Sequence, residues 1–345
     1  RQRQMCIRDR NTFCLETHKE GINCWDKDLQ RYIYSTQVES YHPFRLYMNE
    51  LPAWDGTDRL KPLAKRISDI PLWIKSFHTW MLGLAAQWLG VTQTQANSVA
   101  PILISEEQGR HKSTFCRMLM PPQLARYYSD NLKLTAQGNP ERLLAEMGLL
   151  NMDEFDKFGA QKMPLLKNLM QMSSLNICKA YQKNFRSLPR IASFIGTSNR
   201  TDLLCDPTGS RRFICIEAEH DIDCTGIEHS QIYAQLKEEL LAGARHWFNK
   251  EEEHALQCHN MAYYHVNPIE DIVRNTYAPA TLNESDCLSL SAAIIHQELK
   301  KRFPAALRSC TPIQLAQIFT ATGISRQHTR LGNVYLVKRV KDSEE

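Results

Sequence analysis

The chain has 345 residues, of which 43% are hydrophobic and 23% are charged. These fractions are typical of a globular protein with a buried core, and they exclude a wholly disordered, collagen-like or coiled-coil chain. The formal net charge of +4 is too small to require or to exclude a nucleic-acid partner. The longest apolar stretch, Trp80 to Val91, is interrupted by Gln87 and is too short to span a bilayer, so we expect no membrane partner.

The eleven cysteines are spread over the whole chain, and no two of them have the CxxC spacing of a metal or redox motif. An odd number of scattered cysteines does not indicate the disulfide framework of a small exported protein. We therefore expect reduced thiols and a cytoplasmic location.

The first ten residues differ in character from the rest. The run Met5-Cys6-Ile7-Arg8-Asp9-Arg10 resembles the translation of a transposon end used in sequencing libraries. We therefore treat residues 1–10 as an assembly artefact and leave them out of the fold prediction. On this interpretation we expect that the natural N-terminus, and an upstream domain with it, are missing.

Residues 11–92 are predicted to form a helical N-terminal region. Helical patterns cover Asp26–Tyr34 and His42–Leu51, and Asp55-Gly56 marks a tight turn. From Pro71 to Val91, a proline in the first turn and aromatic residues at a spacing of about 3.6 predict one long helix. We expect those aromatic side chains to lie in the core rather than to stack on bases.

The hydrophobic period changes in residues 93–225, where short apolar runs predict strands that are buried on both faces. The runs are Val99–Ile104, Leu149–Met152, Ile191–Ile195 and Phe213–Ile216. Helical stretches lie between several of them, which predicts an α/β sandwich.

The remaining chain is predicted to be mainly helical. Residues 226–284 are expected to form a lid or linker, and residues 285–345 a small winged-helix-like domain. That domain would contain helices over Ser289–Phe303 and Pro312–Thr322, followed by a β-hairpin that turns at Gly332-Asn333.

The first predicted strand runs into a segment with the features of a phosphate-binding loop. In such a P-loop, backbone N–H groups cradle phosphate, a lysine reaches the β- and γ-phosphates, and a hydroxyl binds Mg²⁺. Glu106 and His111 occupy the two glycine positions of the pattern GxxxxGK[ST], so the match is incomplete. The residues predicted to bind ATP are Gln108, Gly109, His111, Lys112, Ser113 and Thr114.

Two acids, Asp153 and Glu154, end the second predicted strand. This is the Walker B arrangement, in which the first acid helps to hold Mg²⁺ and the second orients or activates the attacking water. We therefore predict Ser113 and Asp153 as metal ligands and Glu154 as a catalytic residue. Acids at the end of a strand are also common in loops.

Two further motifs follow. Asn199 ends the third predicted strand, where its amide could sense the γ-phosphate, and Arg211 and Arg212 precede the fourth. A guanidinium at that point suits an arginine finger supplied by a neighbouring subunit. The simpler alternatives are a turn-capping asparagine and surface ion pairs. Because the four motifs lie at strand ends in the order that an NTPase needs, we predict Asn199, Arg211 and Arg212 as catalytic residues.

Basic residues are concentrated in residues 161–212, which hold nine Lys and Arg and only two acids. Such a concentration is typical of phosphate contact, and aromatic residues between basic ones suit single-stranded nucleic acid. The residues predicted to bind it are Lys179, Tyr181, Lys183 and Arg186. The alternative is a solvated face with aromatic residues in the core.

From about Tyr41 to Asp223 the chain resembles the virulence-associated protein E family, P-loop ATPases similar to the superfamily 3 helicases of phages and mobile elements. The resemblance rests on Tyr41-His42-Pro43, Trp54-Asp55-Gly56, Gly109–Thr114, Asp153-Glu154, Gly196–Arg200 and Asp206–Phe213. His111 departs from the glycine that is usual in the family.

The resemblance implies an AAA+-like P-loop core, an ATP-dependent motor that forms a homo-oligomeric ring, and an attached primase domain or partner. It also implies that the segment with Lys179 to Arg186 is a hairpin that grips single-stranded DNA in the central channel. The C-terminal end resembles an uncharacterised domain that follows this module in Bacteroides-type proteins.

The sequence therefore predicts an ATP-dependent DNA helicase of the primase–helicase type from a mobile element or phage. It would hydrolyse ATP with Mg²⁺ and act on single-stranded or forked DNA. The alternative is a DNA-binding regulatory module whose degenerate P-loop does not hydrolyse ATP, because Glu106 and His111 prevent it.

Overall fold

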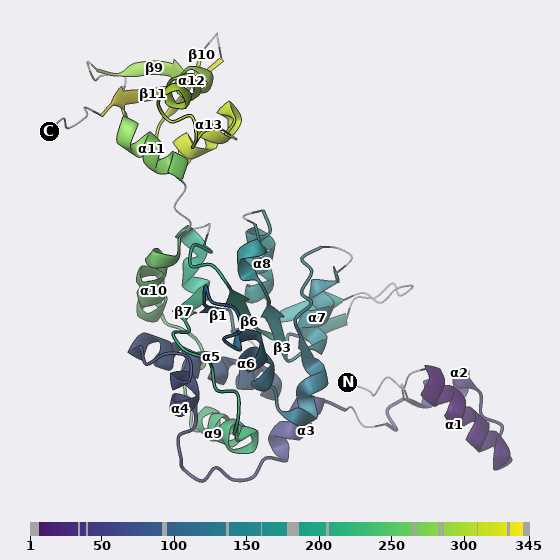
Figure 1. Cartoon of the computed structure of the whole chain (residues 1–345). Coiled ribbons are helices and arrows are strands. Elements are labelled where there is room, and N and C mark those ends of the chain that lie inside the picture. The colour runs from purple at the N-terminus through teal and green to yellow at the C-terminus, as the bar shows by residue number, and fades with distance from the viewer. Residues whose placement is uncertain are drawn as a thin grey trace. The chain divides into compact units, whose positions relative to one another are not determined.

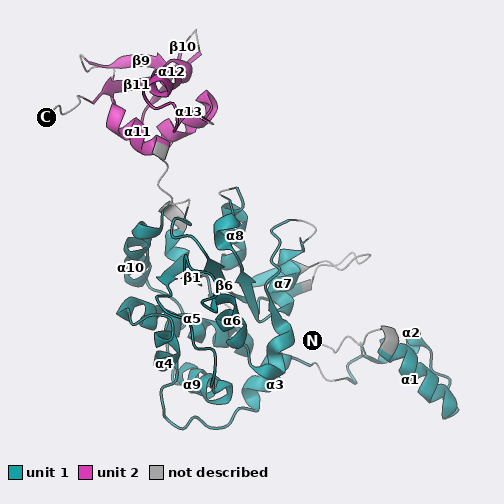
Figure 2. Ribbon diagram, viewed as in Figure 1, with its two compact units in different colours: residues 1–264 teal, residues 265–345 magenta. Residues whose placement is uncertain are grey.

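A computed structural model of the chain describes residues 7–33, 35–38, 41–91, 95–135, 138–159, 161–177, 186–204, 207–264, 268–281, 284, 286–308, 310–329 and 332–340. The chain divides into two compact units, residues 1–264 and residues 265–345, which are coloured separately in Figure 2. In the parts that the model describes, no helix is both long and apolar enough to cross a membrane.

The first unit is built on a parallel five-stranded sheet with the order β2-β3-β6-β1-β7 (Figure 1). Its strands are β1 (Ala100–Ile104), β2 (Tyr128–Ser129), β3 (Leu149–Met152), β6 (Ser193–Ser198) and β7 (Phe213–Glu217). After β1 the chain adds β2, β3 and β6 on one side and then adds β7 on the other side. In open α/β sheets, ligands bind outside the carboxyl ends of the strands at such a reversal, which here is the end of β1.

Helices cover both faces of this sheet. One core cluster joins alternate strand residues such as Leu103 and Leu149 to α3 (Pro43–Asn49), α4 (Leu60–Lys65), α5 (Pro71–Leu89), α6 (Lys112–Met118) and α9 (His229–Leu241). The other joins Ile102 and Leu150 to α7 (Pro140–Glu146), α8 (Met163–Gln171) and the 3₁₀ helix η5 (Asn260–Tyr263). The predicted α/β class is therefore confirmed.

The long helix α5 closely matches its predicted bounds. Pro71 lies in its first turn, and Gly90 ends it in a left-handed conformation with φ 78°. Trp73 and Trp80 are buried, and the Trp80 indole donates to the backbone oxygen of Phe194 in β6 at 3.1 Å. The prediction that these aromatic residues belong to the core is confirmed.

The first unit has further helices and strands, some of which contribute residues to these cores, such as Leu256 to the first and Leu175 to the second. These elements are α1 (Ile7–Lys19), α2 (Asp26–Ile33), α10 (Lys250–His259), η1 (Pro122–Tyr127), η3 (Phe155–Lys157), η4 (Pro207–Arg212) and the antiparallel pair β4 (Ser174–Ile177) and β5 (Arg186–Pro189). The sequence did not predict β2, β4 or β5. Residues 7–10, treated above as an artefact, lie in α1.

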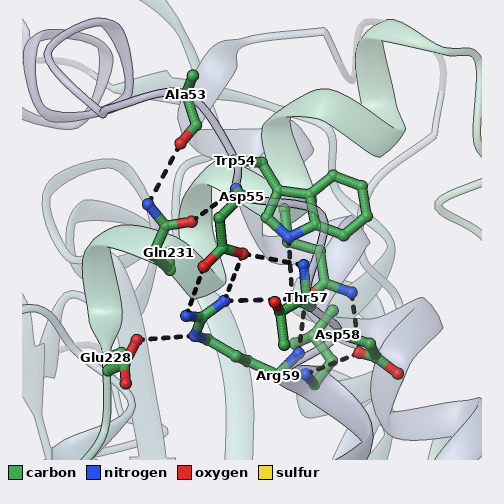
Figure 3. Close-up of polar contacts among 10 residues, drawn as sticks. Ala53, Trp54, Asp55, Thr57, Asp58, Arg59, Glu228 and Gln231 are labelled. Atoms are coloured by element: carbon green, nitrogen blue, oxygen red, sulfur yellow. Dashed lines mark hydrogen bonds and ion pairs between the residues drawn. The ribbon is translucent and has the colours of Figure 1, made fainter.

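The turn at Trp54–Thr57 is fastened to α9 (Figure 3). Arg59 donates to both carboxylate oxygens of Asp55 at 2.7 Å and to Glu228 at 2.8 Å. Gln231 accepts from the Asp55 backbone and donates to the carbonyl oxygen of Ala53. Residues almost 180 positions apart in the sequence are thereby joined, so this motif stabilises the fold.

The second unit contains α11 (Pro268–Thr276), β8 (Tyr277–Pro279), β9 (Leu288–Ser291), α12 (Ala292–Arg302), α13 (Pro312–Ala321), β10 (Arg326–Thr329) and β11 (Gly332–Arg339). Strand β11 pairs antiparallel with β8, β9 and β10. The division falls at residue 265 rather than at the predicted residue 285, because β8 pairs with β11 and Val273 lies in the core of this unit.

The predicted hairpin near the C-terminus is present, but its turn lies earlier than expected. Gly332 pairs with Thr329 and already belongs to β11. The chain therefore turns before Gly332, not at Gly332-Asn333. The alternation of polar and apolar residues predicted the strands, but the glycine did not mark the turn.

Candidate functional site

The loop between β1 and α6 lies at the carboxyl end of β1, where the strand order reverses. Its conformation depends on two left-handed residues, Gly109 with φ 88° and His111 with φ 60° and ψ 21°. The carbonyl oxygen of His111 accepts from the backbone N–H of Phe115 at 2.8 Å and so begins the helix. The usual glycine of the pattern is explained by this geometry, since a left-handed conformation costs other residues about 1–2 kcal/mol.

Lys112 is buried, with 7% of its surface exposed. Its Nζ donates to the backbone oxygen of Ser105 at 3.0 Å and to Oδ1 of Asn199 at 3.0 Å. Burial lowers the pKa of Lys112, and the nearby charge of Arg110 lowers it further. The structure therefore brings together two residues that the sequence predicted for one site although they are far apart in the chain.

Asp153 lies just beyond β3 and is held by two hydroxyl groups. Its Oδ1 accepts from Ser113 Oγ at 3.0 Å and from Thr197 Oγ1 at 2.5 Å. The predicted metal ligands Ser113 and Asp153 are thus in direct contact. Thr197 was not predicted as a site residue, although it belongs to the same Thr-Ser-Asn strand end as Asn199.

Glu154 is exposed at the same edge of the sheet. Its carboxylate forms an ion pair with Lys157 in η3 at 2.6 Å. Glu154 has φ 52° and ψ 52°, so it is a second non-glycine residue of the site in the left-handed region. Such strained residues cluster at functional sites.

The acidic residues of the loop do not face the phosphate position. Glu107 pairs with Arg110 at 2.7 Å, and Arg110 also donates to the backbone oxygen of Ala218 after β7 at 2.9 Å. Glu106 is exposed and is not among the residues that line the cavity described next. The repulsion expected from Glu106 is therefore small in this arrangement.

These segments enclose an open cavity of about 360 Å³. It is lined by Gln108, Gly109, Arg110, His111, Lys112, Ser113, Thr114, Asp153, Glu154, Thr197, Ser198 and Asn199. All six residues predicted to bind ATP line it, together with both predicted acids and Asn199. Arg110, Thr197 and Ser198 are additions that sequence reasoning missed.

The donor set fits a metal–triphosphate ligand. Hydroxyl and carboxylate oxygens are the ligands that Mg²⁺ prefers. Ser113 and Asp153 present one of each, and the two oxygens lie 3.0 Å from each other. Beside them, Lys112 and the loop N–H groups suit an anion. The cavity volume of about 360 Å³ lies within the usual range of ligand sites.

The other predicted residues lie elsewhere. Arg211 and Arg212 belong to η4 and do not line the cavity of their own chain; Arg211 pairs with Glu253 of α10 at 3.1 Å. Lys179, Tyr181 and Lys183 lie outside the described residues. Arg186 is described through its backbone, where it pairs with Ile177 between β5 and β4.

Comparison with known proteins gives two family matches. Residues 48–265 match the model of the virulence-associated protein E-like domain, and residues 266–337 match a domain of unknown function from B. theta (DUF3874). No curated protein matches the chain.

Similar solved structures include apo structures of the C-terminal region of NrS-1 that span residues 305–718 of that protein. Two of them share 15% and 16% identity with this chain at a TM-score of 0.42, covering 85% of this chain and 78% of theirs.

Proposed function

The chain belongs to the virulence-associated protein E-like family, and on that premise we propose that it is a Mg²⁺-dependent ATPase of the primase–helicase type. It would act on DNA during replication of a mobile element or phage. The observation that carries the proposal is the convergence of Lys112, Ser113, Asp153 and Asn199 in one cavity at the carboxyl end of the sheet.

Each residue has a role that its position supports. Lys112 and the N–H groups of the loop hold the triphosphate, with Arg110 keeping the loop tied to the end of β7. Mg²⁺, held by Ser113 and Asp153, would neutralise charge on the phosphates. Thr197 donates to the same oxygen of Asp153 as Ser113 does and so helps to hold the carboxylate.

Glu154 orients or deprotonates the attacking water. Lys157 pairs with Oε2 of the Glu154 carboxylate, which leaves Oε1 to accept from the water. The pair is exposed and therefore weak, so it opens readily. Asn199 accepts a hydrogen bond from Lys112, which supports a role for its amide beside the γ-phosphate.

We also propose that the site is completed by a second copy in a homo-oligomeric ring. Arg211 lies on the surface, outside the cavity of its own chain, as an arginine finger supplied to a neighbour would. Glu253 holds its guanidinium in the isolated chain.

Single-stranded or forked DNA is the proposed partner. The strands β4 and β5 pair antiparallel and flank the segment with Lys179, Tyr181 and Lys183. Directly after β5 the chain enters β6, which ends beside Asn199. DNA bound at the segment that connects β4 to β5 would therefore be linked through β5 and β6 to the nucleotide site.

The second unit is proposed to be a winged-helix-like domain that contacts the DNA backbone. Its helices α11, α12 and α13 are followed by the hairpin of β10 and β11. Lys338 and Arg339 of that hairpin pair with Glu284 and Glu298, so Arg326 and His328 are the better candidates for phosphate contact.

A cytoplasmic location is part of the proposal. The described cysteines are free thiols, which is the usual state of cysteines in that compartment.

The proposal is tested by ATP hydrolysis with and without single-stranded DNA. We expect wild-type protein to hydrolyse ATP faster with DNA, and Lys112→Ala to lose turnover while it keeps its thermal unfolding midpoint. Lys61→Ala, an exposed lysine on α4, is the control and should resemble wild type. DNA binding without any hydrolysis would instead identify the non-hydrolysing regulatory module. Undiminished turnover in Lys112→Ala would refute the site.

A further inference from the structure

A buried polar pair lies beneath the metal-binding acid. Asn151 in β3 has none of its surface exposed, and both its amide nitrogen and its amide oxygen lack a hydrogen-bond partner. The hydroxyl of Tyr128 in β2 is buried and likewise lacks one. Among the residues that the structure describes, these are the only buried side-chain polar atoms without a partner.

The two side chains are neighbours on one face of the sheet. Tyr128 is paired with Leu149, and Asn151 lies two residues further along the same strand, so all three side chains point to the face covered by α6. Burial raises the pKa of Tyr128, while Asn151 acts on the same hydroxyl in the opposite direction. Tyr128 and Asn151 lie on one face of two paired strands, two positions apart in register, so their side chains are diagonal neighbours.

Asp153 follows Asn151 by two residues, just beyond the end of β3, and its contact with Ser113 places it on the same side of the sheet. Side chains two residues apart along a strand lie on one face, about 6.6 Å from each other. Ser113 of α6 contacts Asp153, which confirms that Asp153 faces the helix as Leu149 does. One water that makes two hydrogen bonds of about 2.8 Å spans about 5.6 Å, enough to join the amide to the carboxylate.

A structural role does not explain an asparagine here. Leu149, Leu150 and Met152 of β3 are apolar and fully buried. A leucine has the same branched shape and number of side-chain heavy atoms as asparagine and would avoid burying an unpaired amide, which carries a cost in free energy. The amide is therefore available to bind a small polar molecule such as water.

We propose that Asn151 and Tyr128 bind a buried water that hydrogen-bonds to the Asp153 carboxylate and thereby positions it for Mg²⁺. Ser113 and Thr197 both donate to Oδ1 of Asp153, and the water would fix the carboxylate from below. Asn151 and Tyr128 are positioning residues, since they act through Asp153. The inference rests on the proposed function, because it concerns the same metal site.

The test measures how strongly Mg²⁺ tightens nucleotide binding. The affinity of a fluorescent ATP analogue is measured with Mg²⁺ and with EDTA for wild type, Asn151→Leu, Tyr128→Phe and the double variant. Partners behind a metal ligand typically contribute 10–100-fold to metal affinity, so each single variant should need about tenfold more Mg²⁺. Tyr127→Phe removes a hydroxyl that contacts Arg126 instead and is the control.

Thermal unfolding separates this role from a structural one. We expect Asn151→Leu to unfold at or above the wild-type temperature, and its EDTA affinity to equal that of wild type. Because the two residues share one water, the double variant should be no worse than the worse single variant.

An unchanged Mg²⁺ requirement in both single variants would overturn the inference alone. Wild-type protein that binds the nucleotide no tighter with Mg²⁺ would overturn the proposed metal site together with it. A lower unfolding temperature in Asn151→Leu with wild-type Mg²⁺ dependence would show that the amide is purely structural.

Discussion

The left-handed conformation of His111 gives a quantitative prediction about the loop. With φ 60° and ψ 21°, its backbone is strained because Cβ lies too close to the following carbonyl oxygen, and the cost for a non-glycine residue is about 1–2 kcal/mol. Glycine removes that strain but loses about 0.5–1 kcal/mol more backbone entropy on folding. His111→Gly should therefore stabilise the first unit by about 0.5–1 kcal/mol, which raises the unfolding midpoint by about 1–4 °C.

The matched control is His111→Ala, which removes the imidazole but keeps the Cβ and so keeps the strain. Thermal unfolding of the three proteins, followed by calorimetry, isolates the backbone contribution as the difference between the glycine and alanine variants. If the glycine variant were no more stable than the alanine variant, the position would not require a left-handed residue, and the explanation of the glycine pattern would be wrong.

Two further predictions concern the ion pairs of the first unit. Burial alone raises the pKa of Glu252, but hydrogen bonds from Arg245 and Lys75 lower this pKa to about 2. The stabilisation that the Glu252 carboxylate contributes is therefore complete above the unfolded pKa near 4.5 and is lost as the pH falls through 2. In acid titrations of stability, the difference between wild type and Glu252→Gln should close over that range. The control Glu251→Gln should show no such difference. Arg59→Met, which removes the contacts with Asp55 and Glu228, should lower the unfolding midpoint clearly more than Arg31→Met. The ion pair of Arg31 spans 3.7 Å and its guanidinium is 81% exposed, so it contributes little. Equal midpoints would show that the contact with α9 does not stabilise the fold.

The sequence predicted the central strands and the long helix because their signals are local. The buried runs at Val99–Ile104 and Leu149–Met152 and the capped, aromatic-rich helix from Pro71 gave bounds close to those of β1, β3 and α5. The third strand was predicted to begin at Ile191, two residues before β6, but its polar end before Asn199 was predicted, and Gly196–Ser198 pair with β1. Pairing with distant residues, which no local pattern shows, also decides β2, β4 and β8.

The candidate site was predictable as far as its residues are motif positions at strand ends. Their convergence in one cavity follows from the parallel sheet, which brings all carboxyl ends to one edge. Thr197 was missed because a hydroxyl inside a strand is ordinary. Asn151 was missed because it was counted within an apolar run, although a polar residue in a strand buried on both faces was the available signal.

The most direct test of the proposed ATPase site is Glu154→Gln, measured for ATP affinity and turnover in the same preparation. The carboxylate serves the attacking water while Lys112 holds the phosphates, so affinity should stay within about threefold of wild type and turnover should fall about 100-fold or more. Glu141→Gln on α7 should change neither. Wild-type turnover in Glu154→Gln, or loss of ATP binding together with turnover, would contradict the assignment of Glu154 to catalysis.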